Sequence, residues 1–177
     1  GSTPPSTIVI GQTNTPASGG VFLRGLGALT LGAITTSNVP VDVTTVGSLT
    51  AAGAIASGSG NVTLAAGTTL SESGGGLINT TALLTTSSVG GTTLNLVNTI
   101  TGFNATNTTS GGIALTNTGA LTITGISQMG GGNVFVSNLG SISTTGPISA
   151  GITGNVTLLA LGGGNSLTVG SPILTAS

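Results

Sequence analysis

The sequence predicts an all-β protein, a three-sided parallel β-helix (β-solenoid) of about seven coils of about 21 residues each. Apolar and polar residues alternate at the two-residue period of a strand, β-branched residues are frequent, and glycine recurs in every stretch that would otherwise suit a helix. The apolar pattern also repeats: Ile113, Leu121 and Ile126 are followed 21, 21 and 22 residues later by Val134, Ile142 and Ile148. Such a period is typical of a solenoid, in which each coil buries its apolar edge against its neighbours.

Residues 1–20 lie outside this repeat. They are rich in Pro, Ser, Thr and Gly, and we expect an N-terminal arm or cap strand there, followed by a β-helix repeat domain over residues 21–177. The arm contains one short β-branched run, and Ile8, Val9 and Ile10 are its core. We expect this run to form an edge strand, a cap, or an arm that adds as a strand to a neighbouring subunit.

From Val21 onward, three columns of apolar residues are expected to stack along the rod, one for each strand of a coil. Their members are Val21, Val41, Val62, Leu84, Ile113, Val134 and Val156 in the first column, Leu29, Leu49, Leu70, Leu94, Leu121, Ile142 and Leu167 in the second, and Ile34, Ile55, Ile78, Ile100, Ile126, Ile148 and Ile173 in the third. Each buried member contributes on the order of 1.5 to 3 kcal/mol. Asn61, Asn133 and Asn155 precede first-column residues and are expected to form a structural ladder of side-chain amides.

The fourth coil departs from the period, because 29 residues separate Leu84 from Ile113. We assign the excess to a loop over residues 103–110 that leaves the rod. Loops on rigid scaffolds often carry binding function, so the candidate binding residues are Phe103, Asn104, Thr106, Asn107 and Thr108, with a tolerated insertion as the alternative. Asn104 and Asn107 are also glycosylation sequons in this segment and are the candidate acceptors.

Two segments resemble the repeats of a known family. I-A-L-T-N-T-G-A-L-T-I-T-G, which starts at Ile113, and G-N-V-T-L-A-A-G-T-T-L, which starts at Gly60, are similar to repeats of filamentous haemagglutinin-type proteins. These proteins are large secreted bacterial adhesins, exported by two-partner secretion, whose shafts are right-handed parallel β-helices. Autotransporter passengers and other β-helical surface proteins share this pattern. The resemblance covers residues 21–177 and implies an extracellular or cell-surface location.

The chain has almost no charge: 2% of its residues are charged, and Arg24, Asp42 and Glu72 are the whole set. Nucleic acids and anionic lipids are recognised through basic residues, so neither is an expected partner. No run of 18 apolar residues occurs, so no membrane-spanning helix is expected. The absence of Cys and His removes the usual thiol nucleophile, soft-metal ligands and proton shuttle.

These residues do not suggest an enzyme. Asp42 is expected to face outward, and a bend at its corner is expected to release Glu72 to solvent, so the two carboxylates do not form a catalytic pair. Ser and Thr have no base to activate them, and no Asp recurs as calcium-binding β-rolls require. We therefore expect no cofactor and no metal. With so few titratable groups, we also expect stability to depend little on pH.

Three functions fit this sequence. The first is a structural one, an extracellular fibre or adhesin shaft that forms homopolymers by end-to-end coil stacking or strand addition. Phe22 and Phe135 are expected to face outward as subunit contacts, with cover by the N-terminal segment or ordinary surface exposure as the alternatives. The second is an adhesin module that binds carbohydrate or a host surface through the 103–110 loop. The third and weaker one is ice binding by an outward row of polar side chains, Thr30, Thr50, Ser71, Asn95, Thr122, Ser143 and Thr168.

Overall fold

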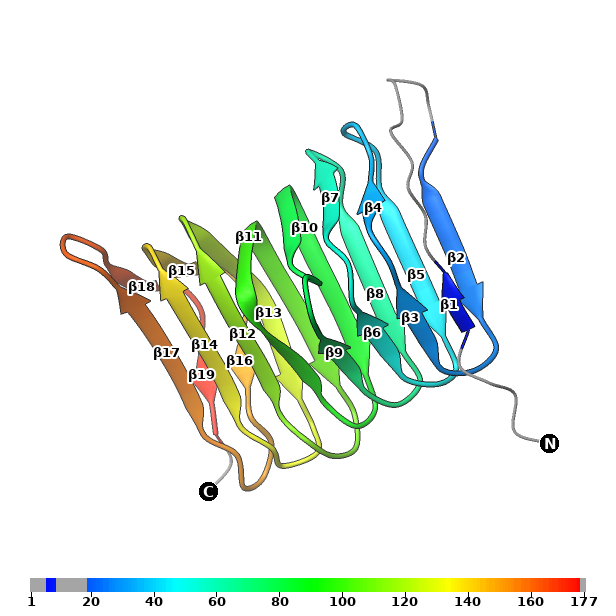
Figure 1. The fold of residues 1–177 in the computed structure, drawn as a ribbon. Helices are drawn as coiled ribbons and strands as arrows, with labels where there is room; N and C mark the ends of the chain where they lie inside the picture. The colour runs from blue at the N-terminus through cyan, green and yellow to red at the C-terminus, as the bar shows by residue number, and fades with distance from the viewer. Residues whose placement is uncertain (1–5, 9–18, 176–177) are drawn as a thin grey trace.

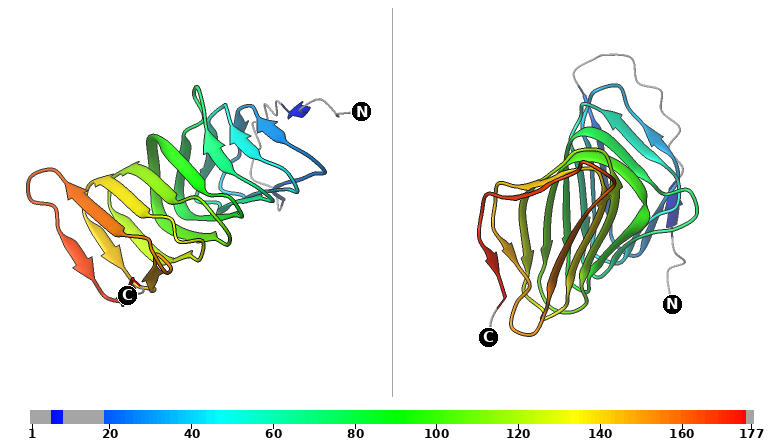
Figure 2. Two further views of the ribbon diagram at one scale, coloured as in Figure 1. Left: turned by 90° about the horizontal axis from the view of Figure 1, so that it is seen from below. Right: turned by 90° about the vertical axis from the view of Figure 1, so that its left-hand side faces the viewer.

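The protein forms a parallel β-solenoid of about seven stacked coils of about 21 residues. This architecture is taken from a computed structural model that describes residues 6–8 and 19–175. Figure 1 shows the coils arranged side by side, with β1 and β2 at one end and β17, β18 and β19 at the other. Seen end-on, the coils superpose around a common interior (Figure 2). The predicted fold class is confirmed.

Two long parallel ladders and one short ladder run along the rod. The first long ladder contains, in order, β2 (Val21–Gly25), β5 (Val41–Thr45), β8 (Val62–Ala66), β10 (Ile78–Ser88), β11 (Thr92–Asn107), β13 (Leu121–Gln128), β15 (Ile142–Thr144) with β16 (Ile148–Ser149), and β18 (Leu167–Val169) with β19 (Ile173–Leu174). The second contains β1 (Ser6–Ile8), β3 (Leu29–Leu31), β6 (Leu49–Ala51), β9 (Leu70–Glu72), β11, β12 (Ile113–Thr118), β14 (Val134–Leu139) and β17 (Val156–Leu161). The short ladder joins β4 (Ile34–Thr35), β7 (Ile55–Gly58), β10 and β11.

The core is a stack of inward side chains from every coil. In the first three coils the expected columns are present: Val21 pairs with Val41 and Val41 with Val62, and the second and third columns pair in the same way. These side chains are buried, as strand alternation requires. Each coil therefore covers the apolar edge of the coil before it.

The predicted columns are wrong in their connection only around the fourth coil. In the last three coils they stack as predicted, with Ile113, Val134 and Val156, then Leu121, Ile142 and Leu167, then Ile126, Ile148 and Ile173 in succession. Leu70 pairs with Thr92, and Thr92 pairs with Ile113, so the predicted second column continues into the residues assigned to the first. Ile126 pairs with Ala105, whereas Ile100 pairs with Thr80. The columns are alike in composition and period, and for this reason the sequence alone does not distinguish which one continues into which.

The predicted loop over residues 103–110 is also wrong, because most of it is strand. Leu84 pairs with Phe103, nineteen residues later, and Phe103 pairs with Ile123 after another twenty. Phe103 is fully buried and fills the place where an aliphatic residue was expected. The coil therefore contains no insertion, and the apparent excess arose from aligning Leu84 with Ile113.

Two ladders of buried amides lie inside the corners of the later coils. In one, the Nδ2 of Asn117 donates to Asn138 Oδ1 at 2.9 Å, while Asn117 Oδ1 accepts from the Ile100 backbone N–H at 2.9 Å. In the other, Asn107 Nδ2 donates to Gln128 Oε1 at 2.7 Å. At the corners, some backbone groups have no partner in the strand ladders, and these side chains bond to them. An apolar residue at the same position would leave those groups unpaired.

The amide ladder predicted at Asn61, Asn133 and Asn155 is not the one that forms. All three side chains are exposed. A single link remains among them, from the Asn155 backbone N–H to Asn133 Oδ1 at 2.9 Å.

The N-terminal run contributes a strand to its own chain. Residues Ser6–Ile8 form β1, which pairs in parallel with β3 of the first coil. This is the edge-strand role among the predicted alternatives. Val9 and Ile10 lie outside the described residues. No helix in the described part of the chain is long and apolar enough to cross a membrane.

Replacing Phe103 with Ala should lower the free energy of unfolding by about 3 to 5 kcal/mol, because it leaves a cavity at a fully buried site. Phe22→Ala is the matched control, since Phe22 is 63% exposed and its loss should change stability by less than about 0.5 kcal/mol. Denaturant unfolding of both variants measures the difference. Equal effects would contradict the placement of Phe103 in the core.

Candidate functional site

A shallow depression lies on the outer face of the rod where β11 and β13 run side by side. Its volume is about 260 Å³, and it is lined by Asn104, Ala105, Thr106, Thr124, Gly125, Ile126, Ser127 and Pro147. Strand alternation turns Asn104 and Thr106 outward, while Phe103, Ala105 and Asn107 between them point into the core. The structure thus brings two of the five predicted binding residues to one concave surface.

The depression exists because the outward row lacks a side chain at one place. Asn104 pairs with Gly125 after a register shift in the ladder, and a Cβ at position 125 would lie 3.2 Å from Asn104 Nδ2. Because position 125 has no side chain, the Asn104 amide has room beside it, and its Nδ2 donates to Thr124 Oγ1 at 3.3 Å. The lining offers hydroxyl and amide groups without any charge, which suits hydrogen bonding to an uncharged polar ligand.

The other predicted residues of this segment do not join the depression. Phe103 and Asn107 are fully buried, and Thr108 is exposed in the turn that follows β11. The buried Asn107 side chain is therefore not accessible for glycosylation in the folded protein, which corrects its assignment as an acceptor. Asn104 is partly exposed. The sequence does contain a signal that places this segment within the repeat: the amide residues Asn107 and Gln128 are 21 residues apart, and their side chains bond in the structure.

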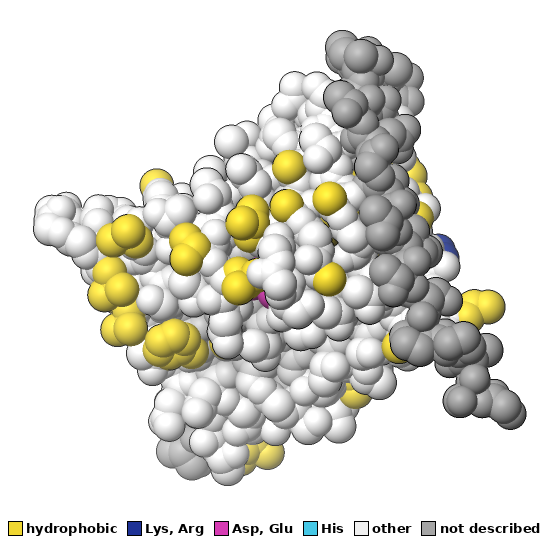
Figure 3. Space-filling view, viewed as in Figure 1, with side chains coloured by type: hydrophobic (Ala, Val, Ile, Leu, Met, Phe, Trp, Pro, Cys, Tyr) yellow, Lys and Arg dark blue, Asp and Glu magenta, His cyan; other side chains and the backbone are white. Residues whose placement is uncertain are grey.

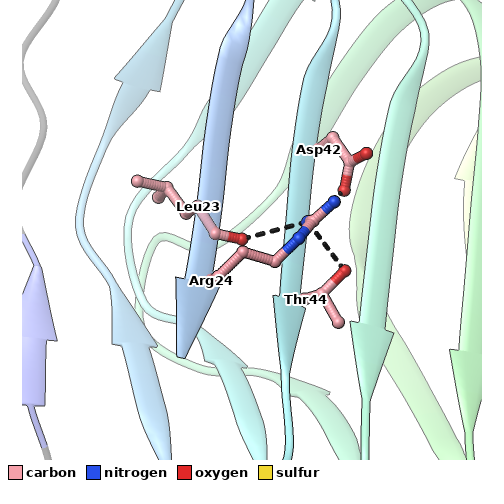
Figure 4. A network of polar contacts seen from close by, with 4 residues as sticks. All are labelled: Leu23, Arg24, Asp42 and Thr44. Atoms are coloured by element: carbon pink, nitrogen blue, oxygen red, sulfur yellow. Dashed lines mark hydrogen bonds and ion pairs between the residues drawn. The ribbon is translucent and has the colours of Figure 1, made fainter. Parts of the chain in front are cut away.

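The first two coils carry the one ion pair among the described residues (Figure 4). Arg24 Nη1 donates to Asp42 Oδ1 at 2.9 Å, to Thr44 Oγ1 at 2.9 Å and to the Leu23 carbonyl oxygen at 3.2 Å. The hydrogen bond with Asp42 and the attraction of its charge raise the pKa of Arg24. Asp42 faces outward, as predicted, and these two opposite charges offset each other at the surface.

Glu72 is inside the coil rather than released to solvent, so that prediction is wrong. It ends β9 at an inward position, in register with the buried Ala51. Its Oε2 accepts from the Leu96 backbone N–H at 2.9 Å, whereas Oε1 is buried without a hydrogen-bond partner. Burial raises the pKa of Glu72 to about 7, although the hydrogen bond from the Leu96 N–H and the proximity of the Asn98 side chain oppose this increase.

The outward polar row on which the ice-binding hypothesis depends is divided in the structure. Thr30, Thr50 and Ser71 form one file, which continues through Thr93 to Ala114 and Phe135. A separate file contains Thr122, Ser143 and Thr168, and Asn95 belongs to neither. The expected single row is therefore wrong, and the hypothesis loses its structural support.

Exposed apolar side chains gather at the end of the rod formed by the last coils. Figure 3 shows them over β14 and β17, on a face with almost no charged surface. Phe135, Leu139, Leu159 and Leu161 point outward there, and Phe135 is 40% exposed. Phe22 also points outward, at the opposite end. The predicted orientation of both phenylalanines is confirmed, while their role as subunit contacts stays a prediction.

The final coil also exposes the side chains of the core columns themselves. Leu167, Val169 and Ile173 continue those columns yet are 44%, 51% and 38% exposed. At the first coil, by contrast, Val21 and Leu29 are only 6% and 3% exposed. The two ends of the described rod therefore differ, and the apolar edge is open at β18 and β19.

Comparison of the chain with protein-family models, with curated proteins and with solved structures found no match. Within the described residues, no three His, Cys, Asp or Glu side chains come together as metal ligands. The features of the described residues that bear on function are the depression, the isolated Glu72 carboxylate and the open end.

The half-buried Glu72 carboxylate gives the protein a pH-dependent stability, contrary to the weak dependence on pH expected from composition. The folded state binds the proton more tightly than the unfolded chain, whose glutamate has the ordinary pKa of 4.5. The stability gained from this tighter proton binding is fully present below about pH 4.5 and is lost as the pH rises through about 7. We expect the free energy of unfolding to fall by about 1 to 2 kcal/mol over this range. The change is this small because solvent screens the half-buried carboxylate.

Urea unfolding of the wild type and Glu72→Gln at pH 4.5, 6 and 8 measures this loss, since those values span the shift in pKa. The variant keeps an acceptor for the Leu96 N–H and should show a flat profile. Asp42→Asn is the control and should retain the wild-type slope. A wild-type free energy that does not change over this range would contradict the burial of the carboxylate.

Proposed function

We propose that this chain is a structural segment of an extracellular or cell-surface fibre or adhesin shaft, and that copies of it associate through the final coil. The open apolar edge of β18 and β19 is the observation that carries the proposal. A solenoid coil with exposed core columns gains most by stacking another coil of the same kind, because the new coil buries those columns. Leu167, Val169 and Ile173 form the contact surface in this proposal.

The distribution of charge supports the same function. The only cation in the sequence, Arg24, is paired with Asp42, and the remaining carboxylate is inside the third coil. Copies of the chain can therefore approach each other closely with little electrostatic repulsion. The same arrangement leaves no acid and base converging on one bond, so we propose that the chain is not an enzyme.

The difference between the two ends guides how copies would associate. The core columns of the first coil are already buried, and β1 pairs with the edge of β3 that faces away from β6. Coil stacking through this end would have to place the new strand beside β1 rather than beside β3. Strand addition to β1 and stacking on β18 and β19 are therefore the two contacts of the proposed fibre.

Val169→Lys should reduce association of the chain, because it places a charge on the exposed core column of the last coil. Sedimentation velocity and electron microscopy of the wild type should show assemblies or threads, and the variant should sediment as a smaller species. Thr157→Lys adds the same charge nearby on the outward face of β17 and should associate like the wild type. A monomeric wild type would reject association through this end.

A second candidate function is carbohydrate binding at the depression beside Asn104. The observation that favours it is the concave, uncharged lining of hydroxyl and amide groups, with Thr106 and Thr124 on neighbouring strands. A sugar offers many hydroxyl groups that donate to and accept from such side chains. This candidate keeps the predicted residues Asn104 and Thr106 and replaces the loop by a strand surface.

Thr106→Val should weaken glycan binding about five- to tenfold, the effect of losing one hydrogen bond of about 1 kcal/mol. Screening of the wild type on a glycan array identifies the probe, and calorimetry with that glycan measures the change. Ser87→Ala is the control, because Ser87 pairs with Thr106 on the same outward row but does not line the depression. Equal weakening by both variants, or an array without binding, would exclude this site.

A further inference from the structure

The regular stacking of coils is interrupted in one part of the rod. Among the described pairings, register shifts occur only where β10 or β11 is a partner: at Asn79 and Thr80 against β7, between Thr80 and Leu83 against β11, between Leu94 and Asn98 against β12, and between Phe103 and Asn104 against β13. The described ladders on either side, from β2 to β9 and from β12 to β19, keep a constant register. The rod therefore consists of two regular blocks joined by an irregular segment.

Glu72 lies at the entrance to this segment. It is the last residue of β9, and its carboxylate is bonded to the Leu96 N–H inside the irregular stretch of β11 between Leu94 and Asn98. The chain next turns through Ser73 and three consecutive glycines, of which Gly74 has a φ of 59° that favours glycine. The half-buried carboxylate of Glu72 thus connects a glycine-rich corner with the least regular strand.

No charged group is available to stabilise the ionised form of Glu72. β9 has no other titratable side chain, and β6, β8 and β11, which pack against it, have none. Arg24 is on the outward face of β2 and is already bonded to Asp42. When the proton leaves, Oε1 remains a buried anionic oxygen without a donor, which is a costly state.

We propose that Glu72 makes the joint between the two regular blocks sensitive to pH. With Glu72 neutral, β9, the turn over residues 73–77 and β11 pack as the structure shows. With Glu72 ionised, the carboxylate moves to water, the bond to Leu96 breaks, and this joint opens locally while both blocks stay folded. The rod becomes more easily bent or disrupted at its middle as the surroundings change from acidic to neutral or alkaline.

Opening of this kind is expected because irregular, weakly paired segments unfold locally at lower free energy than regular core strands. The rise in the pKa of Glu72 to about 7 supports the idea and places the transition near neutral pH. The cost of ionisation is concentrated at one joint, since the only other side-chain carboxylate in the sequence, Asp42, faces outward and pairs with Arg24.

Hydrogen exchange of the full chain at pH 5 and pH 8, corrected for the intrinsic rate at each pH, tests the proposal. Protection of the amides from Ser73 to Leu77 and from Leu94 to Asn98 should fall at least about tenfold at pH 8. Protection in β5 and β14 should stay the same. Glu72→Gln should remove the change, and Asp42→Asn, which alters the outward carboxylate, should keep it.

Carboxyl ¹³C NMR of the wild type gives a second measurement that needs no variant. Glu72 is the only glutamate in the chain, so its signal is unambiguous. It should titrate near pH 7 together with the Leu96 amide. Titration near 4.5, equal protection at both pH values, or loss of protection throughout the rod would overturn the proposal. These readouts are made within one molecule, so they are independent of whether copies associate.

Discussion

Stacking between successive coils is the interaction on which the rest of this structure depends. A coil of about 21 residues has strands too short to be stable alone, and both its backbone groups and its apolar edge are satisfied only by the coils before and after it. Parallel pairing at this period places like side chains above one another, so Val21, Val41 and Val62 form a continuous column. Stability is therefore shared along the rod, and it is weakest wherever the stacking is interrupted.

Polar residues inside the rod show how the corners are stabilised. The later coils turn their corners with buried amides, and Asn107, Asn117 and Asn138 donate and accept at backbone groups that the ladders leave free. Glu72 occupies a comparable inward position but has only one strong backbone donor and one unpartnered oxygen. An amide is neutral at every pH, whereas a carboxylate is not. The same kind of position thus gives a permanent link in one coil and a titratable one in another.

The surface of the rod has few features from which a function can be argued, and they are of different kinds. The depression beside Asn104 is polar and uncharged, and the last coil is apolar and open. Both features are consistent with the proposed shaft, in which the surface is almost uncharged and contacts are made at the depression and at the last coil. The parallel β-solenoid fold itself follows from the coil period.

The sequence by itself determined the fold class, the period, the inward columns of the first three and the last three coils, and the outward orientation of Phe22, Phe135 and Asp42. These follow from strand alternation and from a repeat that neighbouring coils must share. Only the tertiary structure decided how the columns continue past Leu84, that Phe103 belongs to the core, and that Glu72 is enclosed. Three columns of similar composition and equal spacing are interchangeable in sequence. Which one stacks on which is set by contacts between residues about 20 positions apart, such as Phe103 with Leu84 and Ile123.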